Sequence, residues 1–201
     1  MSNSLAFVFP GQGSQAIGMS SALAAQFPLV QNIYKEASDA LGIDLWAMTQ
    51  EGPIEELSQT QNTQPALLTA GVAAYRCWLE AGGKAPSLMA GHSLGEYTAL
   101  CCAGALNFAD AVALVRDRGR YMQEAVPAGE GGMAAIIGLE DDQVRSICSE
   151  VSTPDAIVQA VNFNAPGQVV IAGSTAGIAT AMEALKAAGA KRALPLPVSI
   201  P

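Results

Sequence analysis

The sequence Ser-Leu-Met-Ala-Gly-His-Ser-Leu-Gly at residues 87–95 joins a short apolar segment to a Gly-x-Ser-x-Gly motif. Residues 87–90 predict a buried strand and residues 97–105 predict a helix, so the motif falls on a strand-to-helix turn. A serine on such a turn projects its hydroxyl above the sheet, and the flanking glycines let the chain crowd there. The turn also directs the Leu94 backbone N–H, at a helix N-terminus, towards an oxyanion formed at Ser93. We therefore predict a nucleophilic serine at position 93 rather than a chance match in a glycine-rich chain.

A second apolar segment, residues 5–9, predicts another buried parallel strand, and Gln12 lies on the glycine-rich loop that follows it. This loop lacks both the glycine spacing of a dinucleotide fingerprint and the Gly-Lys-Ser/Thr of a P-loop. The carboxyl ends of parallel strands meet at one edge of the sheet. Gln12 therefore either lines the site near Ser93 or belongs to an ordinary strand-to-helix turn.

Hydrophobic periodicity and Gly/Pro positions predict helices alternating with strands, which indicates an α/β fold. In the first half we expect five helices besides that of the motif: four at residues 16–26, 28–42, 65–81 and 108–125, and a short one that begins at Pro53. After a Pro/Gly-rich linker at residues 127–132 the predicted order becomes β-α-β-β-α-β, the ferredoxin-like split unit. Its strands are predicted at residues 133–139, 156–163, 168–172 and 190–199, and its helices at residues 141–151 and 175–188. We accordingly divide the chain into residues 1–126, residues 127–198 and a short return at residues 199–201.

Arg118 lies on an apolar stripe of the predicted 108–125 helix, in line with Ala111, Val115 and Met122. Burying an unpaired guanidinium is costly, so Arg118 should meet a carboxylate. One reading is a structural ion pair inside the protein. The other is a bidentate clamp for the carboxylate of a substrate.

His92 is the single histidine of the chain and directly precedes the serine. Adjacent side chains on a sharp turn diverge, so His92 is not expected to reach the serine oxygen as its base. The four cysteines include no CxxC pair and predict neither a metal site nor a redox site. Cys101 and Cys102 have no close basic neighbour in the sequence, and we expect them to pack in the core.

The composition excludes several classes of function. The chain has 201 residues, half of them hydrophobic, and a net charge of −8 without a basic run, which argues against nucleic acid and anionic membranes as partners. No apolar stretch reaches the roughly 18 residues of a transmembrane helix. The first nine residues lack the features of a signal peptide, so we expect a cytoplasmic protein, and a monomer.

Five separated motifs then resemble one family, the bacterial malonyl-CoA:acyl-carrier-protein transacylases of fatty-acid synthesis. They are Phe-Val-Phe-Pro-Gly-Gln-Gly-Ser-Gln (7–15), Thr-Gln-Pro-Ala (63–66), Gly-His-Ser-Leu-Gly-Glu (91–96), Arg-Gly-Arg-Tyr-Met-Gln (118–123) and Asn-Phe-Asn-Ala-Pro-Gly-Gln (162–168). The resemblance implies an α/β-hydrolase-like large subdomain, incomplete here, with an inserted ferredoxin-like small subdomain. It also implies two substrates, malonyl-CoA and the phosphopantetheinyl acyl carrier protein, and no permanently bound cofactor.

By the same resemblance, Ser93 takes the malonyl group from coenzyme A, and Gln12 with the Leu94 N–H forms the oxyanion hole. Arg118 binds the malonyl carboxylate. A second half-reaction passes the malonyl group to the carrier thiol.

The resemblance further implies that Gln64 and Met122 line the substrate pocket, and that Asn162 and Asn164 contact coenzyme A or the carrier arm. The family's catalytic histidine follows a segment matching Pro-Val-Ser-Ile-Pro at residues 197–201, so we expect the chain to be truncated before its base. Two alternatives remain: an esterase or thioesterase of the same fold, and a non-catalytic carrier-binding fragment.

Overall fold

The structure is a computed structural model that describes residues 4–127 and 129–196. The chain divides into two compact units, one ending at Tyr121 and the other beginning at Met122. This division falls inside a helix, five residues before the boundary proposed from the sequence after residue 126. Each unit is described below by itself.

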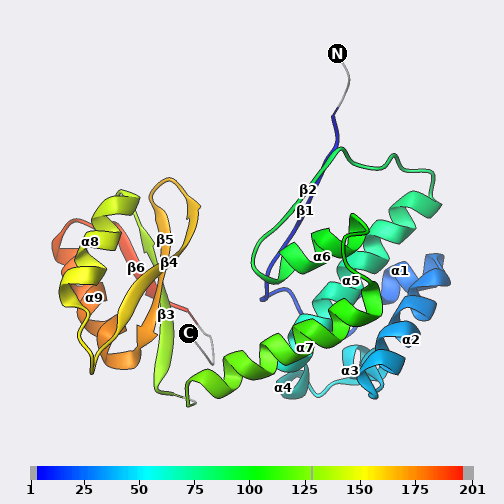
Figure 1. The fold of residues 1–201 in the computed structure, drawn as a ribbon, viewed down its shortest axis with the longest axis horizontal. Coiled ribbons are helices and arrows are strands. Elements are labelled where there is room, and N and C mark those ends of the chain that lie inside the picture. Colours follow the sequence, from blue (N-terminus) through cyan, green and yellow to red (C-terminus); the bar gives the residue numbers. More distant parts are fainter. Residues whose placement is uncertain (1–3, 128, 197–201) are drawn as a thin grey trace. The chain divides into compact units, whose positions relative to one another are not determined.

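The first unit combines one pair of strands with seven helices in its described residues (Figure 1). In chain order these are β1 (Ala6–Phe9), α1 (Ser21–Gln26), α2 (Leu29–Leu41), α3 (Leu45–Glu51), α4 (Ile54–Leu57), α5 (Thr60–Glu80), β2 (Leu88–Gly91), α6 (Leu94–Cys102) and α7 (Phe108–Ala125).

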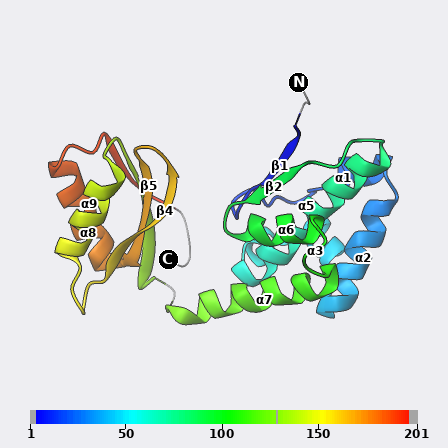
Figure 2. The ribbon, with the colours of Figure 1, turned by 45° about the horizontal axis from the view of Figure 1, so that its top comes forward.

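The two strands β1 and β2 pair in parallel, with Ala6 opposite Leu88 and Phe9 opposite Gly91. Both views in Figures 1 and 2 show them side by side along most of their length. Since the strands are parallel and in register, the loops that follow Phe9 and Gly91 leave the sheet at the same edge. The predicted strands at residues 5–9 and 87–90 are thus confirmed to within one residue.

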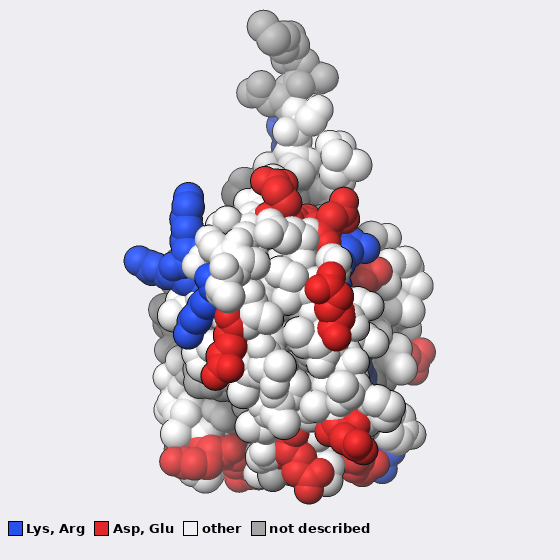
Figure 3. All heavy atoms as spheres, turned by 90° about the vertical axis from the view of Figure 1, so that its left-hand side faces the viewer, with Lys and Arg blue, Asp and Glu red and all other residues white. Residues whose placement is uncertain are grey.

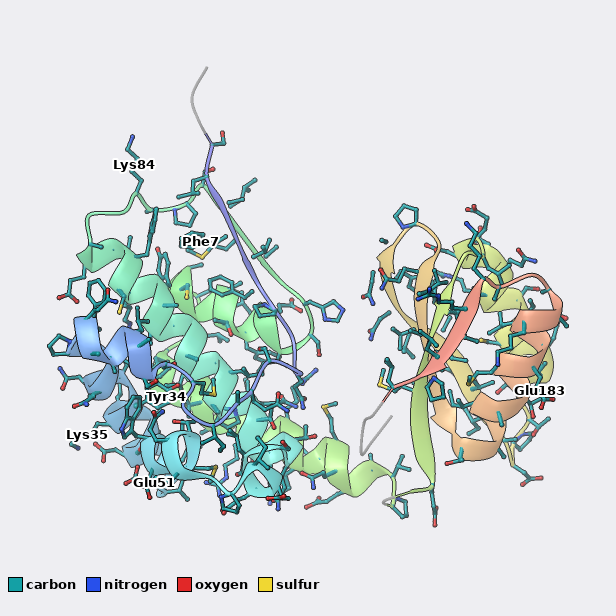
Figure 4. The ribbon with its side chains drawn as sticks, turned by 180° about the vertical axis from the view of Figure 1, so that it is seen from behind. Phe7, Tyr34, Lys35, Glu51, Lys84 and Glu183 are labelled. Atoms are coloured by element: carbon teal, nitrogen blue, oxygen red, sulfur yellow. The ribbon has the colours of Figure 1, made fainter. Side chains whose placement is uncertain are left out.

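The helices of this unit form its hydrophobic core, in which Tyr34 of α2 and the side chains of Leu68 and Val115 are fully buried. Figure 4 labels Tyr34 among these helices. Its ring meets that of Trp46 edge-on, with 4.9 Å between centroids, and its hydroxyl lies 3.0 Å from the Ser20 Oγ. On the other side of the unit, Phe7 of β1 packs edge-on against Tyr75 of α5 (Figure 4).

Helix α3 was not predicted, and three of the predicted helix starts differ from the observed ones by three residues or more. Helix α1 begins at Ser21 rather than near residue 16, because Ser20 adopts a left-handed backbone with φ of 66°. Helix α6 begins at Leu94, directly after the serine of the motif, instead of at residue 97.

Helix α5 begins at Thr60, five residues before the start predicted at Pro65, which lies inside the helix. Side-chain hydrogen bonds hold this early first turn against α4. Asn62 Nδ2 donates to the Glu56 carbonyl at 3.0 Å, and Thr63 Oγ1 donates to the Leu57 carbonyl at 2.6 Å. These contacts join two helices in the folded chain, and local helix propensity does not predict them.

The second unit contains β3 (Gly131–Ile137), α8 (Asp141–Val151), β4 (Val158–Ala165), β5 (Gln168–Ser174), α9 (Thr175–Ala187) and β6 (Arg192–Pro195). Its four strands form an antiparallel sheet in the order β4-β5-β3-β6. Helices α8 and α9 lie on one face of this sheet (Figure 1) and bury Val144, Leu185 and Ile171 between the layers.

The β-α-β-β-α-β order predicted for this part of the chain is confirmed, and helix α8 has the predicted bounds. The strand β3 begins and ends two residues earlier than predicted, and β4 begins two residues later. The predicted last strand, residues 190–199, extends into residues 197–199, which lie outside the described ranges.

Among the described residues, no helix combines the length and the apolar character needed to cross a membrane.

Candidate active site

Ser93 lies on a sharp turn between β2 and α6 with backbone angles φ 53° and ψ −111°, a region that residues other than glycine rarely occupy. Such strain costs on the order of 1–3 kcal/mol and is found preferentially at functional sites. The two glycines of the motif permit the turn. A Cβ at Gly91 would collide with the backbone of Gly95, and a Cβ at Gly95 would collide with the Phe9 carbonyl. The serine hydroxyl is thereby presented at the carboxyl edge of the strand pair, as the motif predicted.

The loop after β1 lies against this turn. The His92 backbone N–H donates to the Phe9 carbonyl at 3.0 Å, and a Cβ at Gly11 would approach His92 Nδ1 to 3.1 Å. His92 is exposed, and its imidazole lies beside the β1 loop. Gln12 stands on the same loop, which supports the reading that places it at the site rather than in an ordinary turn.

Arg118 of α7 donates two hydrogen bonds that join the predicted site residues. Its Nη2 lies 3.0 Å from Ser93 Oγ, and its Nη1 lies 2.7 Å from Gln64 Oε1. Gln64 Nε2 in turn donates to Gln12 Oε1 at 3.0 Å. Ser93, Arg118, Gln64 and Gln12, which come from four separate segments, therefore form one connected network.

The acceptors observed for Arg118 are an amide oxygen and a hydroxyl, not the carboxylate expected from the sequence. Within residues 4–127 and 129–196 no carboxylate forms an ion pair with Arg118, whose side chain is half-buried. The two arginines nearest to Arg118 in the sequence bind other groups. Arg120 pairs with Asp117 at 3.0 Å, and Arg116 donates to the Leu41 carbonyl at 2.8 Å.

Close helix packing places Arg118 next to Gln64. At Gly119 a Cβ would lie 2.6 Å from the Gln61 Cα and 2.7 Å from the Thr60 carbonyl oxygen, so only glycine lets α7 approach the first turn of α5 this closely. Gln64 follows one turn later on α5 and is fully buried. A buried amide with hydrogen bonds at both ends has little freedom to reorient.

Tyr97 also contacts the guanidinium, with Arg118 Cζ 5.6 Å from the centre of its ring. A cation over an aromatic face at this distance is attracted to it. The sequence contained a signal for this residue that our prediction missed, because Tyr97 is four residues after Ser93 and such residues share a helix face.

The cysteines are poor nucleophiles. Burial raises the pKa of the Cys101 thiol to about 11 and that of Cys102 to about 12. Cys77 and Cys148 are buried, and burial raises the pKa of each thiol. In the described part of the chain, no three His, Cys, Asp or Glu side chains gather in a way that would hold a metal ion.

The other predicted site residues belong to the second unit. Asn162 of β4 is half-buried and lies opposite Val170 of β5, which in turn faces Ala135 of β3. Asn164 is exposed near the end of β4, and Met122 is half-buried on α7. The segment Pro-Val-Ser-Ile-Pro at residues 197–201, after which the resemblance places the catalytic histidine, lies outside the described residues.

Comparison with known proteins agrees with this geometry. The family model described as the acyl transferase domain matches residues 6–198. The chain belongs to the acyl transferase domain family.

Within this family the chain is similar to curated enzymes named malonyl CoA-acyl carrier protein transacylase. It is 63% identical to that of Escherichia coli (strain K12) over 196 residues and 49% identical to that of Bacillus subtilis (strain 168) over 197 residues. Each match covers 98% of this chain, and 63% or 62% of the relative. The chain thus spans somewhat less than two thirds of the relatives' length.

Solved acyl transferase structures also match. The transacylase of Coxiella burnetii gives a TM-score of 0.94 at 55% identity, covering 98% of this chain and 62% of that protein. A malonyl-transacylase solved in complex with its type II PKS acyl-carrier protein gives 0.94 at 59% identity, covering 99% of this chain and 64% of that protein. The α/β fold, with one parallel and one antiparallel sheet, is accordingly that of the acyl transferases.

Proposed function

We propose that the protein transfers the malonyl group of malonyl-CoA to the phosphopantetheine thiol of acyl carrier protein through a malonyl ester of Ser93. The names of its relatives support this activity. The observation that carries the proposed activity is the position of the Arg118 guanidinium. Its Nη2 lies 3.0 Å from Ser93 Oγ, and among the described residues Arg118 has no carboxylate partner.

In the first half-reaction, Ser93 Oγ attacks the thioester carbonyl carbon of malonyl-CoA. The new C–O bond forms, the C–S bond breaks, and coenzyme A leaves as the thiol with the serine proton. The Leu94 N–H, at the start of α6, has no partner within its helix and is suited to stabilise the oxyanion together with Gln12. We assign the proton acceptor to the histidine that the family resemblance places after residues 197–201.

Arg118 supplies the selection for a carboxylated acyl group. Its planar guanidinium can donate two parallel hydrogen bonds to a carboxylate, an arrangement stronger than neutral hydrogen bonds. Once Ser93 is esterified its Oγ becomes a weaker acceptor, which frees Nη2 for the malonyl carboxylate. An acetyl group offers no such partner.

In the second half-reaction the carrier thiol attacks the malonyl ester, and Ser93 regains its proton, which gives ping-pong kinetics. We propose that Met122 lines the substrate pocket and that Asn162 and Asn164 contact coenzyme A or the carrier arm. Lys186, Lys191 and Arg192 of the second unit are exposed and suited to bind an acidic carrier protein. Figure 3 shows Lys and Arg side chains gathered at one side of the face that it draws.

We propose that the first unit is part of an α/β-hydrolase-like subdomain and that the second is an inserted ferredoxin-like subdomain. The Gly-x-Ser-x-Gly turn at the carboxyl end of a parallel strand supports the first assignment. The strand order β4-β5-β3-β6 supports the second.

The test is intact-mass analysis of the full-length protein after brief exposure to malonyl-CoA. We expect a malonyl adduct that disappears when carrier protein is added and that Ser93→Ala does not form. A malonyl adduct that persists in Ser93→Ala would refute the assignment of the nucleophile. Release of free malonate at the same rate with and without carrier would indicate a thioesterase instead.

A further inference from the structure

Gln64 connects the two halves of the site. It is fully buried, and its side-chain amide bridges Arg118 of α7 and Gln12 of the β1 loop. The family resemblance assigns it only to the lining of the pocket. Its contacts indicate a more specific role.

The direction of these hydrogen bonds follows from the chemistry of the partners. A guanidinium can only donate, so Gln64 must present its Oε1 to Arg118 Nη1, at 2.7 Å. Its Nε2 then faces Gln12 and donates to Gln12 Oε1 at 3.0 Å. Because Gln12 accepts through its oxygen, its own NH2 group remains the end available as a donor. The charge of Arg118 thus fixes the orientation of two successive amides.

Resting on the proposed function, we propose that Gln64 is a positioning residue that sets acyl selectivity. It holds the Arg118 guanidinium where the acyl carboxylate must bind, and it fixes the orientation of the Gln12 side-chain amide. The hydrogen bonds that carry this role join Gln64 to Arg118 and Gln12, not to the attacking Ser93 Oγ.

Two substitutions test this role. Gln64→Leu removes both hydrogen bonds at nearly constant size, so Arg118 loses its anchor. Gln64→Glu places a carboxylate beside Arg118, which occupies the guanidinium and removes the donor to Gln12. Both changes should weaken the reaction of malonyl-CoA more than that of acetyl-CoA, since only the malonyl group depends on Arg118.

Asn62 provides the matched control. It lies in the same turn of α5, is also buried, and its amide holds the Glu56 carbonyl rather than Arg118. Asn62→Leu should lower the melting temperature and leave acyl selectivity within about twofold, since it removes one neutral hydrogen bond of the scaffold.

The experiment measures kcat/KM of the full-length enzyme for malonyl-CoA and acetyl-CoA in the wild type, in Gln64→Leu, in Gln64→Glu, in Arg118→Ala and in the Gln64→Leu/Arg118→Ala double variant. We expect each Gln64 variant to lower the malonyl-to-acetyl ratio about 10-fold or more, as is typical when a hydrogen bond to a charged group is lost. In the Arg118→Ala background, Gln64→Leu should change the ratio by less than about threefold.

The outcomes distinguish this inference from the proposed function. If Arg118→Ala lowers the ratio but folded Gln64→Leu and Gln64→Glu do not, the role of Gln64 is refuted and the proposed function stands. An equal drop from Gln64→Leu with and without Arg118 would refute it too, because Gln64 would then act independently. If Arg118→Ala itself leaves the ratio unchanged, the proposed function fails. Should Gln64→Leu not fold, Gln64→Glu alone decides, since it retains a polar side chain.

Discussion

Gly119→Ala should disturb the site without changing any residue of the hydrogen-bonded network. Gly119 follows Arg118 on α7, and a Cβ there would lie 2.6 Å from the Gln61 Cα of α5. Ordinary van der Waals contact begins at 3.4 Å, so the two backbones must separate by about 0.8 Å. The atom met is backbone and cannot rotate aside. The hydrogen bond of 2.7 Å between Arg118 and Gln64 bridges the same two helices and should lengthen with them.

Two opposing effects decide the change in stability. Replacing glycine with alanine inside a helix normally gains up to about 1 kcal/mol. Overpacking a close contact costs about 1–3 kcal/mol. Because the contact is with rigid backbone, we expect the cost to prevail and the free energy of unfolding to fall. A displacement near 1 Å of a group that positions the substrate can lower the rate up to about 100-fold.

The assay is kcat/KM for malonyl-CoA and acetyl-CoA, with thermal unfolding, on the full-length enzyme. We expect Gly119→Ala to lower the malonyl-to-acetyl ratio and the melting temperature together. Gly132→Ala is the control, because a Cβ at Gly132 meets nothing within 4 Å. Wild-type stability and selectivity in Gly119→Ala would refute the reasoning from helix contact.

Three further predictions concern residues around the site. Arg116→Ala removes the hydrogen bond of 2.8 Å to the Leu41 carbonyl at the end of α2. Because Arg116 is partly solvated, we expect this substitution to lower the free energy of unfolding in urea by about 1 kcal/mol. An altered acyl selectivity would contradict a purely structural role for Arg116. Since burial raises the pKa of Cys102 to about 12, iodoacetamide near pH 8 should label it slowly until the protein unfolds, and Cys102→Ala should retain transfer; rapid labelling of the folded enzyme with loss of activity would argue otherwise. Burial also raises the pKa of Tyr34 to about 12, above its unfolded value of about 10. The neutral Tyr34 hydroxyl therefore makes its full contribution to stability below about pH 10, and about 3 kcal/mol of stability is lost as the pH rises through 12. Tyr34→Phe should make this decline shallower, and an unchanged slope would exclude Tyr34 as its cause.

The sequence was sufficient where the decisive information is local. A Gly-x-Ser-x-Gly motif between an apolar segment and a helix predicted the turn at Ser93, and the structure has it. The position of Gln12 near this turn also followed, because two parallel strands bring their carboxyl ends to one edge. Segments with the hydrophobic periodicity of strands alternate with segments that have the periodicity of helices, and this alternation predicted the element order of the second unit.

The partner of Arg118 was beyond a reading of the sequence. The helical stripe showed that this cation faces the interior, yet elementary electrostatics favoured a carboxylate. The amide found there belongs to Gln64, 54 residues away, on a helical turn that the sequence did not predict. That turn exists because Asn62 and Thr63 bind carbonyl groups of the preceding helix, an interaction that only the folded chain provides.

The central claim is that a guanidinium beside the nucleophile selects a carboxylated acyl group. It is tested most directly by exposing the full-length enzyme to an equal mixture of malonyl-CoA and acetyl-CoA and measuring both Ser93 adducts by intact mass. We predict mainly malonyl adduct in the wild type and mainly acetyl adduct in Arg118→Ala. A folded Arg118→Ala variant that still loads mainly malonyl would contradict the account.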